Sequence, residues 1–161
     1  MAEVADEVMR LGSEDGPIAS FLIAWTAARG LHLIVLSPEA PIPGSYWGEP
    51  EAGLIGDSVL ARPDTPLASL LHEICHWICM DESRRASLHT DAGGDDVEEC
   101  GVCYLSVLIA ARVPEYSSAR MLQDMDRWGY SFRLGSAARW FAEDAADARA
   151  WLAARGLFNH A

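Results

Sequence analysis

The sequence predicts an α+β fold, a mainly helical single domain covering residues 1–161 with a small β-sheet. Apolar residues recur at helical spacing over most of the chain, which predicts helices. Two short apolar stretches near the first helical segment have the length and composition of strands. The length fits one domain, and no internal repeat or low-complexity linker divides it.

The first part of the chain predicts one helix and two strands. Pro17 opens an apolar segment that Gly30 closes, and helices favour proline at the start and glycine at the end. The segment LHLIVL, residues 31–36, is short and β-branched, so we expect a buried strand. The segment LIGDSVLA, residues 54–61, is expected to form a second strand.

Residues 37–53 separate these two strands and predict a long loop. The segment holds four prolines and three glycines, which break regular structure. Long irregular loops in compact domains are often functional. Tyr46 and Trp47 are therefore either the lip of a substrate site or aromatic anchors that pin a surface loop.

The next helix carries the most informative motif of the chain. Thr65 is expected to cap it, and Pro66 suits its first turn. Six apolar residues recur at helical spacing and mark the face that we expect in the core. They are Leu67, Leu70, Leu71, Ile74, Cys75 and Ile78.

Three further helical segments complete the expected fold. A polar break over residues 81–94 precedes a second apolar helix, which Asp95 or Asp96 can cap. An amphipathic helix is expected over residues 117–128, and one or two more over the alanine-rich residues 136–155.

His72, Glu73 and His76 form an H-E-x-x-H motif within the capped helix. Side chains four residues apart lie one turn apart on the same face, so the two imidazoles can reach one metal ion. Glu73 lies about 100° round the helix, where it can contact a water on that ion. The motif is typical of sites in which two neutral histidines hold zinc and the glutamate removes a proton from water.

A third protein ligand is needed, and the following helix offers it. Glu98 and Glu99 lie in its first turn, and their bearings differ by about 100°, so only one should ligate. We expect Glu98, because it leads a face that should pack on the motif helix, with Glu99 in reserve. His89, in the polar break, is a weaker candidate.

The four cysteines offer a different metal site. Cys75-x-x-x-Cys79 and Cys100-x-x-Cys103 could supply four thiolates to zinc. However, all four lie in apolar helical segments, where free cysteine behaves as a small buried hydrophobe. A disulfide between the two helices is a further alternative.

The metal-binding pattern resembles the gluzincin-type metallopeptidases, in which two histidines and a glutamate hold zinc. A closer resemblance covers Leu70 to Ile109, where "LLHEICHWICMDESRR" followed by "DVEE" is similar to the elongation factor P hydroxylase family. That resemblance implies a zincin-like helix pair with His72, His76 and Glu98 as ligands. It also implies non-haem iron in place of zinc, and hydroxylation of a modified lysine on elongation factor P.

Two segments of the chain differ from the elongation factor P hydroxylase family, and the role of two arginines stays open. That family is expected to have an aromatic, proline-containing connection between the two helices and a Lys-Pro-Gln after the acidic ligand. Here the connection is "ASLHTDAGGDD" and Glu98 is followed by "ECGVCY". Arg84 and Arg85 match the family by position, and they serve either a substrate or the end of a helix.

Charge and targeting patterns restrict the partners. The chain has 12 basic and 24 acidic residues, a net charge of −12, which disfavours nucleic acid and anionic membrane surfaces. It favours a protein or peptide substrate that is cationic. The N-terminus lacks a signal-peptide pattern, and the longest apolar run is too short to span a membrane, so we expect a cytoplasmic protein with reduced cysteines.

Three hypotheses from different functional classes follow from this sequence. The leading one is a zinc hydrolase of the metallopeptidase type, with Glu73 as general base. The second is the Fe²⁺ hydroxylase, which uses the same ligands. The third is a domain without enzymatic activity that keeps the helix pair for its fold or as a sensor. A peptidase also needs an electrophilic group, for which Tyr46, His89 and Tyr104 are candidates.

Overall fold

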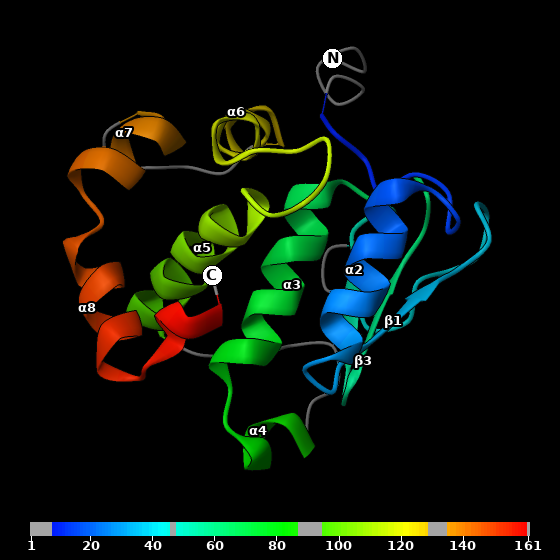
Figure 1. The fold of residues 1–161 in the computed structure, drawn as a ribbon, viewed down its shortest axis with the longest axis horizontal. Helices are drawn as coiled ribbons and strands as arrows, with labels where there is room; N and C mark the ends of the chain where they lie inside the picture. The colour runs from blue at the N-terminus through cyan, green and yellow to red at the C-terminus, as the bar shows by residue number, and fades with distance from the viewer. Residues whose placement is uncertain (1–7, 46–47, 87–94, 129–134, 161) are drawn as a thin grey trace.

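The computed structural model describes residues 8–45, 48–86, 95–128 and 135–160. It confirms the α+β class, because helices dominate and one three-stranded sheet accompanies them. Helix α3 (Leu67–Cys79) lies in the middle of the molecule, with helix α2 (Pro17–Ala27) and the sheet on one side and helix α5 (Asp96–Ala110) on the other (Figure 1). The motif helix is therefore the central support of the fold.

The remaining helices surround this centre. Short helix α4 follows α3 at the lower end of the view, α6 covers the upper end, and α8 packs on the side of α5 away from α3 (Figure 1). Their bounds are α4 Glu82–Ala86, α6 Ser118–Trp128, α7 Ala137–Glu143, α8 Ala146–Ala154 and the 3-10 turn η1 Leu157–His160. The expected helices over 117–128 and 136–155 are thus confirmed, the latter as two helices.

The sheet has the strand order β1-β3-β2. Strand β1 (His32–Val35) pairs in parallel with β3 (Ser58–Ala61), and β2 (Gly53–Ile55) pairs with β3 in the antiparallel sense. The expectation of a single strand over 54–61 is wrong, because the chain reverses inside it. Gly56 has φ of +55°, a left-handed conformation that suits the turn of a hairpin.

The two helix caps expected from the sequence have different outcomes. Asp95 caps α5, since its side chain accepts a hydrogen bond of 2.8 Å from the backbone N–H of Glu98. Thr65 does not cap α3. Its hydroxyl accepts a hydrogen bond of 2.9 Å from the backbone N–H of Arg62, so Thr65 belongs to the preceding turn. Pro66 is the N-cap residue of α3.

One hydrophobic core surrounds α3. The helix packs on β2 and β3 through one face and on α5 through another, so nearly all of its apolar residues are buried. All six residues of the predicted core face are at most 4 % exposed, namely Leu67, Leu70, Leu71, Ile74, Cys75 and Ile78. Within the described ranges, no helix combines the length and apolar character needed to cross a membrane.

Candidate metal centre

The side chains of His72, His76 and Glu99 converge between α3 and α5. The two imidazole Nε2 atoms are 3.0 Å apart. One carboxylate oxygen of Glu99 lies 2.7 Å from Nε2 of His72, and the other lies 3.1 Å from Nε2 of His76. In the described part of the chain, these residues form the one group of three or more metal-binding side chains whose ligand atoms lie this close together.

The three ligand groups converge on one point. Zinc binds histidine nitrogen at about 2.05 Å, so two donors on a tetrahedral ion lie about 3.3 Å apart. The ligand atoms here are 2.7 to 3.1 Å apart, which are hydrogen-bond distances somewhat shorter than that value. Two imidazoles and a carboxylate are also a donor set that zinc and iron both accept. The three residues can therefore hold a metal ion.

The local sequence explains how each ligand reaches this point. His72 and His76 are one helical turn apart on α3, and their rings meet edge to face with centroids 4.6 Å apart. Glu99 reaches them because the cap at Asp95 starts α5 directly before it and α5 packs along α3. The site thus depends on one helix for two ligands and on helix packing for the third.

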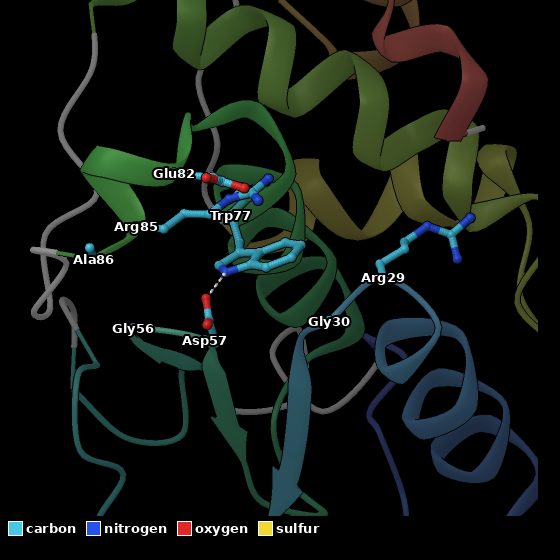
Figure 2. A pocket seen from close by; sticks show the side chains of 8 residues that line it. All are labelled: Arg29, Gly30, Gly56, Asp57, Trp77, Glu82, Arg85 and Ala86. Carbon is cyan, nitrogen blue, oxygen red and sulfur yellow. Dashed lines mark hydrogen bonds between the residues drawn. The ribbon is translucent and has the colours of Figure 1, made fainter.

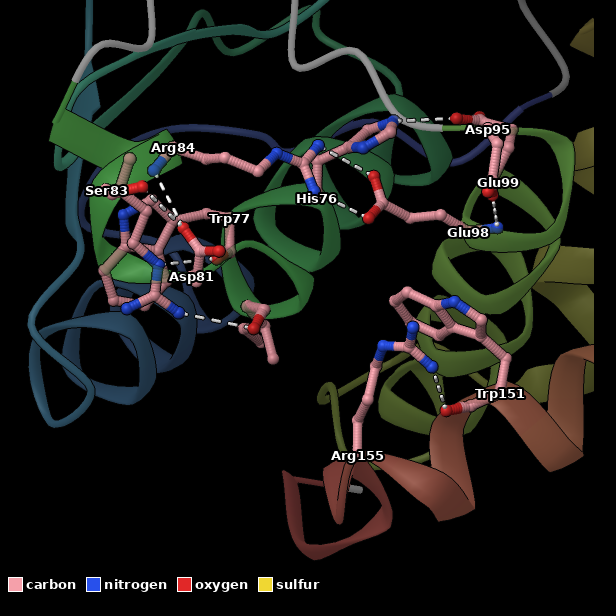
Figure 3. Close-up of polar contacts among 12 residues, drawn as sticks. His76, Trp77, Asp81, Ser83, Arg84, Asp95, Glu98, Glu99, Trp151 and Arg155 are labelled. Carbon is pink, nitrogen blue, oxygen red and sulfur yellow. Dashed lines mark hydrogen bonds and ion pairs between the residues drawn. The ribbon is translucent and has the colours of Figure 1, made fainter.

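Glu98, the third ligand expected from the sequence, binds a different partner. Its two carboxylate oxygens accept hydrogen bonds from Arg84 at 2.7 and 2.9 Å, as Figure 3 shows. The face that Glu98 leads is buried as expected, since Val102 and Leu105 are fully buried. The carboxylate beside the imidazoles belongs to Glu99, the residue held in reserve, which lies one position further round the helix.

Exposure shows that the group opens towards solvent on one side. The side chains of His72 and His76 are 12 % and 8 % exposed, whereas that of Glu99 is 47 % exposed. The imidazoles therefore form the floor of the site, and the carboxylate forms its outer wall.

Contacts within the group lower the pKa of Glu99 and raise the pKa of His76. Burial by itself would raise the pKa of Glu99, but hydrogen bonds from His72 and His76 outweigh it and hold that pKa well below its usual range. Burial would likewise lower the pKa of His76, but the hydrogen bond and charge of Glu99 raise it. The carboxylate is therefore fully ionised, as a metal ligand must be.

Glu73 follows His72 directly on α3 and is half-buried. Burial raises its pKa above the ordinary value of 4.5, even though the charges of His72 and His76 oppose that change. The negative charges of Glu99 and, to a smaller extent, Glu51 add to the increase in its pKa. Glu73 is thus a carboxylate whose affinity for a proton is increased at the position that the motif assigns to a base.

The outer nitrogens of the two histidines have different surroundings. Nδ1 of His72 is 3.7 Å from the sulfur of Cys103, a residue that the sequence analysis did not link to the site. Cys103 follows Glu99 by four positions and therefore lies on the same face of the helix, so this spacing could have indicated that Cys103 is near the site. Nδ1 of His76 is buried and has no hydrogen-bond partner among the described residues.

The other candidates lie elsewhere. All four cysteines are free thiols, and they form no converging ligand group within the described residues. Tyr104 stacks on Phe141 with ring centroids 4.4 Å apart, in an aromatic cluster on the side of α5 that faces α7. Tyr46, Trp47 and His89 lie outside the described residues.

A cavity of about 500 Å³ lies at the C-terminal end of α3 (Figure 2). Trp77 forms part of its wall and donates a hydrogen bond of 3.0 Å from Nε1 to Asp57. Arg85 covers the same indole, with its guanidinium carbon 3.7 Å from the ring centre. None of the three candidate metal ligands lines this cavity, so it is separate from the metal centre.

Comparison of the chain with models of known protein families, with curated proteins and with solved structures finds no match in any of the three. The candidate metal centre therefore stands on the geometry of its own residues.

Proposed function

We propose that this protein is a metal-dependent hydrolase of the metallopeptidase type, with zinc held by His72, His76 and Glu99. Glu73 is its general base. The observation that carries the proposal is the converging group of His72, His76 and Glu99 together with Glu73, which follows His72 on α3 and whose pKa is raised by burial. Hydrolysis requires such a base, whereas metal storage or a purely structural ion does not.

The chemistry divides between the ion and the chain. A bound divalent ion would supply a Lewis acid that polarises the scissile carbonyl and makes water acidic near neutral pH. Glu73 takes the proton from the attacking water and delivers it to the leaving amine. A carboxylate with a raised pKa suits both steps, because it accepts a proton more readily and still releases it.

The surroundings of the site support a peptide substrate. Glu99 is half exposed, so an extended chain can reach the histidines from the surface. The net charge of −12 favours a substrate that carries positive charge. The hydrolase proposal therefore includes a cationic peptide or protein as the substrate class.

The test combines metal analysis with a cleavage assay. We expect the purified protein to hold about one equivalent of zinc and to cleave members of a mixed-sequence quenched-peptide library. Glu73→Gln should keep the zinc and lose at least about 100-fold in rate, because only the base is removed. Glu39→Gln, which changes an exposed carboxylate, is the matched control and should behave as wild type. Zinc-loaded wild type that cleaves nothing, or an active Glu73→Gln variant, would refute the hydrolase.

A second candidate function is the iron-dependent hydroxylase. It is favoured by the ligand set, because two histidines and one carboxylate also suit non-haem Fe²⁺. The resemblance of Leu70 to Ile109 to the elongation factor P hydroxylase family supports the same candidate. Protein purified without oxygen should then retain iron in preference to zinc, and elongation factor P is the substrate to assay.

A further inference from the structure

Two consecutive arginines of α4 bind two different helices. Arg84 donates two parallel hydrogen bonds to Glu98 in the first turn of α5 (Figure 3). Arg85 donates to the backbone carbonyls of Trp77 and Ile78 at the end of α3, at 2.8 and 3.3 Å. Helix α4 therefore connects the end of the helix that supplies both histidines to the turn that supplies Glu99.

Glu98 is a buried carboxylate that depends on this contact. It is 7 % exposed as a residue, and both of its oxygens are bound by Arg84. A buried carboxylate is costly unless it is paired and hydrogen-bonded. If Arg84 were removed, Glu98 would lose its cationic partner, and an ion at the candidate metal centre formed by its neighbour Glu99 would offer another.

The geometry points to a specific role for this pair. We propose that Arg84 is a positioning residue of the metal centre, which selects Glu99 as the carboxylate ligand by holding Glu98 away from the two histidines. This inference rests on the proposed metal site and extends it, because it names the residue that decides between two adjacent carboxylates.

The selection has a chemical consequence for the ion. Two neutral imidazoles and one carboxylate would give a divalent ion a net charge of +1 and leave it an open position, and catalytic zinc sites require the open position. A second carboxylate would cancel that charge and occupy that position. By retaining Glu98, Arg84 keeps the site both electrophilic and accessible.

The decisive experiment first removes the ligand Glu99 and then removes Arg84, which binds the neighbouring Glu98. Binding of Zn²⁺ is measured by competition with a chromophoric chelator, and Co²⁺ binding by its visible absorption. We expect Glu99→Gln to weaken Zn²⁺ binding by about 100-fold or more. The double variant Arg84→Met/Glu99→Gln should recover at least about tenfold, because the released Glu98 replaces the missing ligand.

Three further variants make the outcome specific. Adding Glu98→Gln to that double variant should abolish the recovery, since neither Glu98 nor Glu99 then supplies a carboxylate. Arg139→Met in the Glu99→Gln background is the matched control, because Arg139 pairs with Glu143 on an exposed surface and should not change metal binding. Arg84→Gln provides the same test if Arg84→Met does not fold.

A spectrum distinguishes positioning from a general loss of structure. In Arg84→Met alone, entry of Glu98 as an additional ligand should weaken the Co²⁺ absorption, and Glu98→Gln should restore it. If wild type binds metal but neither recovery nor this spectral change occurs, the role of Arg84 is refuted and the metal site stands. If wild type binds no metal, the proposed function itself fails.

Discussion

Glu98 and Glu99 are consecutive residues of α5, yet their carboxylates are bound by different partners: Arg84 holds Glu98, and the two histidines of α3 hold Glu99. The helix turns their side chains about 100° apart, and the bonds from Arg84 keep Glu98 in the α4 interface while Glu99 lies in the candidate metal centre. Adjacent acids of identical chemistry therefore have separate roles.

This division predicts unequal losses of metal affinity. Glu99→Gln removes a ligand and should weaken Zn²⁺ binding by about 100-fold or more, whereas Glu98→Gln should cost about tenfold or less, because it alters only a neighbouring contact. Competition with a chelator at fixed pH measures both. Equal losses, or a larger loss for Glu98→Gln, would return the ligand assignment to Glu98.

The cysteines are predicted to be unreactive in the folded protein. Burial raises the pKa of Cys79 to about 12, and it raises the pKa of Cys75 and Cys103 well above the ordinary value of 9.0. A change from 9 to 12 lowers the thiolate fraction at neutral pH by about 1,000-fold. Iodoacetamide at pH 7.5 should therefore modify these three thiols far more slowly in the native protein than in guanidinium. Intact-mass spectrometry reads the extent, and rapid native labelling of Cys79 would contradict this account.

The surroundings of Tyr116 predict how the free energy of unfolding changes at alkaline pH. Its hydroxyl donates to the buried carboxylate of Asp124 at 2.9 Å, and burial together with the charge of Asp124 raises the pKa of Tyr116 far above its ordinary value of 10.0. A folded-state pKa above the unfolded one gives stability that is complete below pH 10 and is lost as the pH rises further.

We therefore compare Tyr116→Phe with wild type by urea unfolding from pH 8 to pH 11. At pH 8 the variant should be about 1–2 kcal/mol less stable, because it lacks the hydrogen bond to Asp124. Above pH 10 the difference should shrink, because only wild type has a proton to lose at this position. A difference that stays constant up to pH 11 would show that Tyr116 does not contribute in this way.

Gly101 predicts an effect of packing between α5 and α8. A Cβ atom at this position would lie 2.7 Å from the ring of Trp151, too close for two carbon atoms. Gly101→Ala gains about 1 kcal/mol of helix propensity, but overpacking costs about 1–3 kcal/mol, so we expect a net destabilisation. Thermal unfolding measures it, and the penalty should disappear in the Trp151→Leu background, where the space is open. A stabilised Gly101→Ala variant would contradict the close contact.

The sequence predicted those features that depend on residues close together along the chain. The two histidines and Glu73 lie within five residues, so helical periodicity alone placed them, and the buried face of α3 followed from the same spacing. The cap at Asp95 is also local. The buried face and the cap are confirmed, and His72 and His76 lie together in the converging ligand group, whereas the role of Glu73 stays a prediction.

Features that depend on distant partners could not be read in this way. The choice between Glu98 and Glu99 depends on Arg84, 14 residues before Glu98, because a pattern of acids does not indicate which of them is already paired. The turn at Gly56 is local, and the Gly56-Asp57 pair between two apolar runs was a hairpin signal that the expectation of a single strand overlooked.

The candidate ligands lie on either side of the segment that connects α3 to α5. His76 near the end of α3 and Glu99 at the start of α5 bracket the connection between these helices. An ion bound by both would close this connection into a ring in the folded chain, and it would stabilise the fold because it binds the folded chain and not the unfolded one. Occupancy of the site should then be visible as resistance to thermal unfolding and to proteolysis, independently of any substrate.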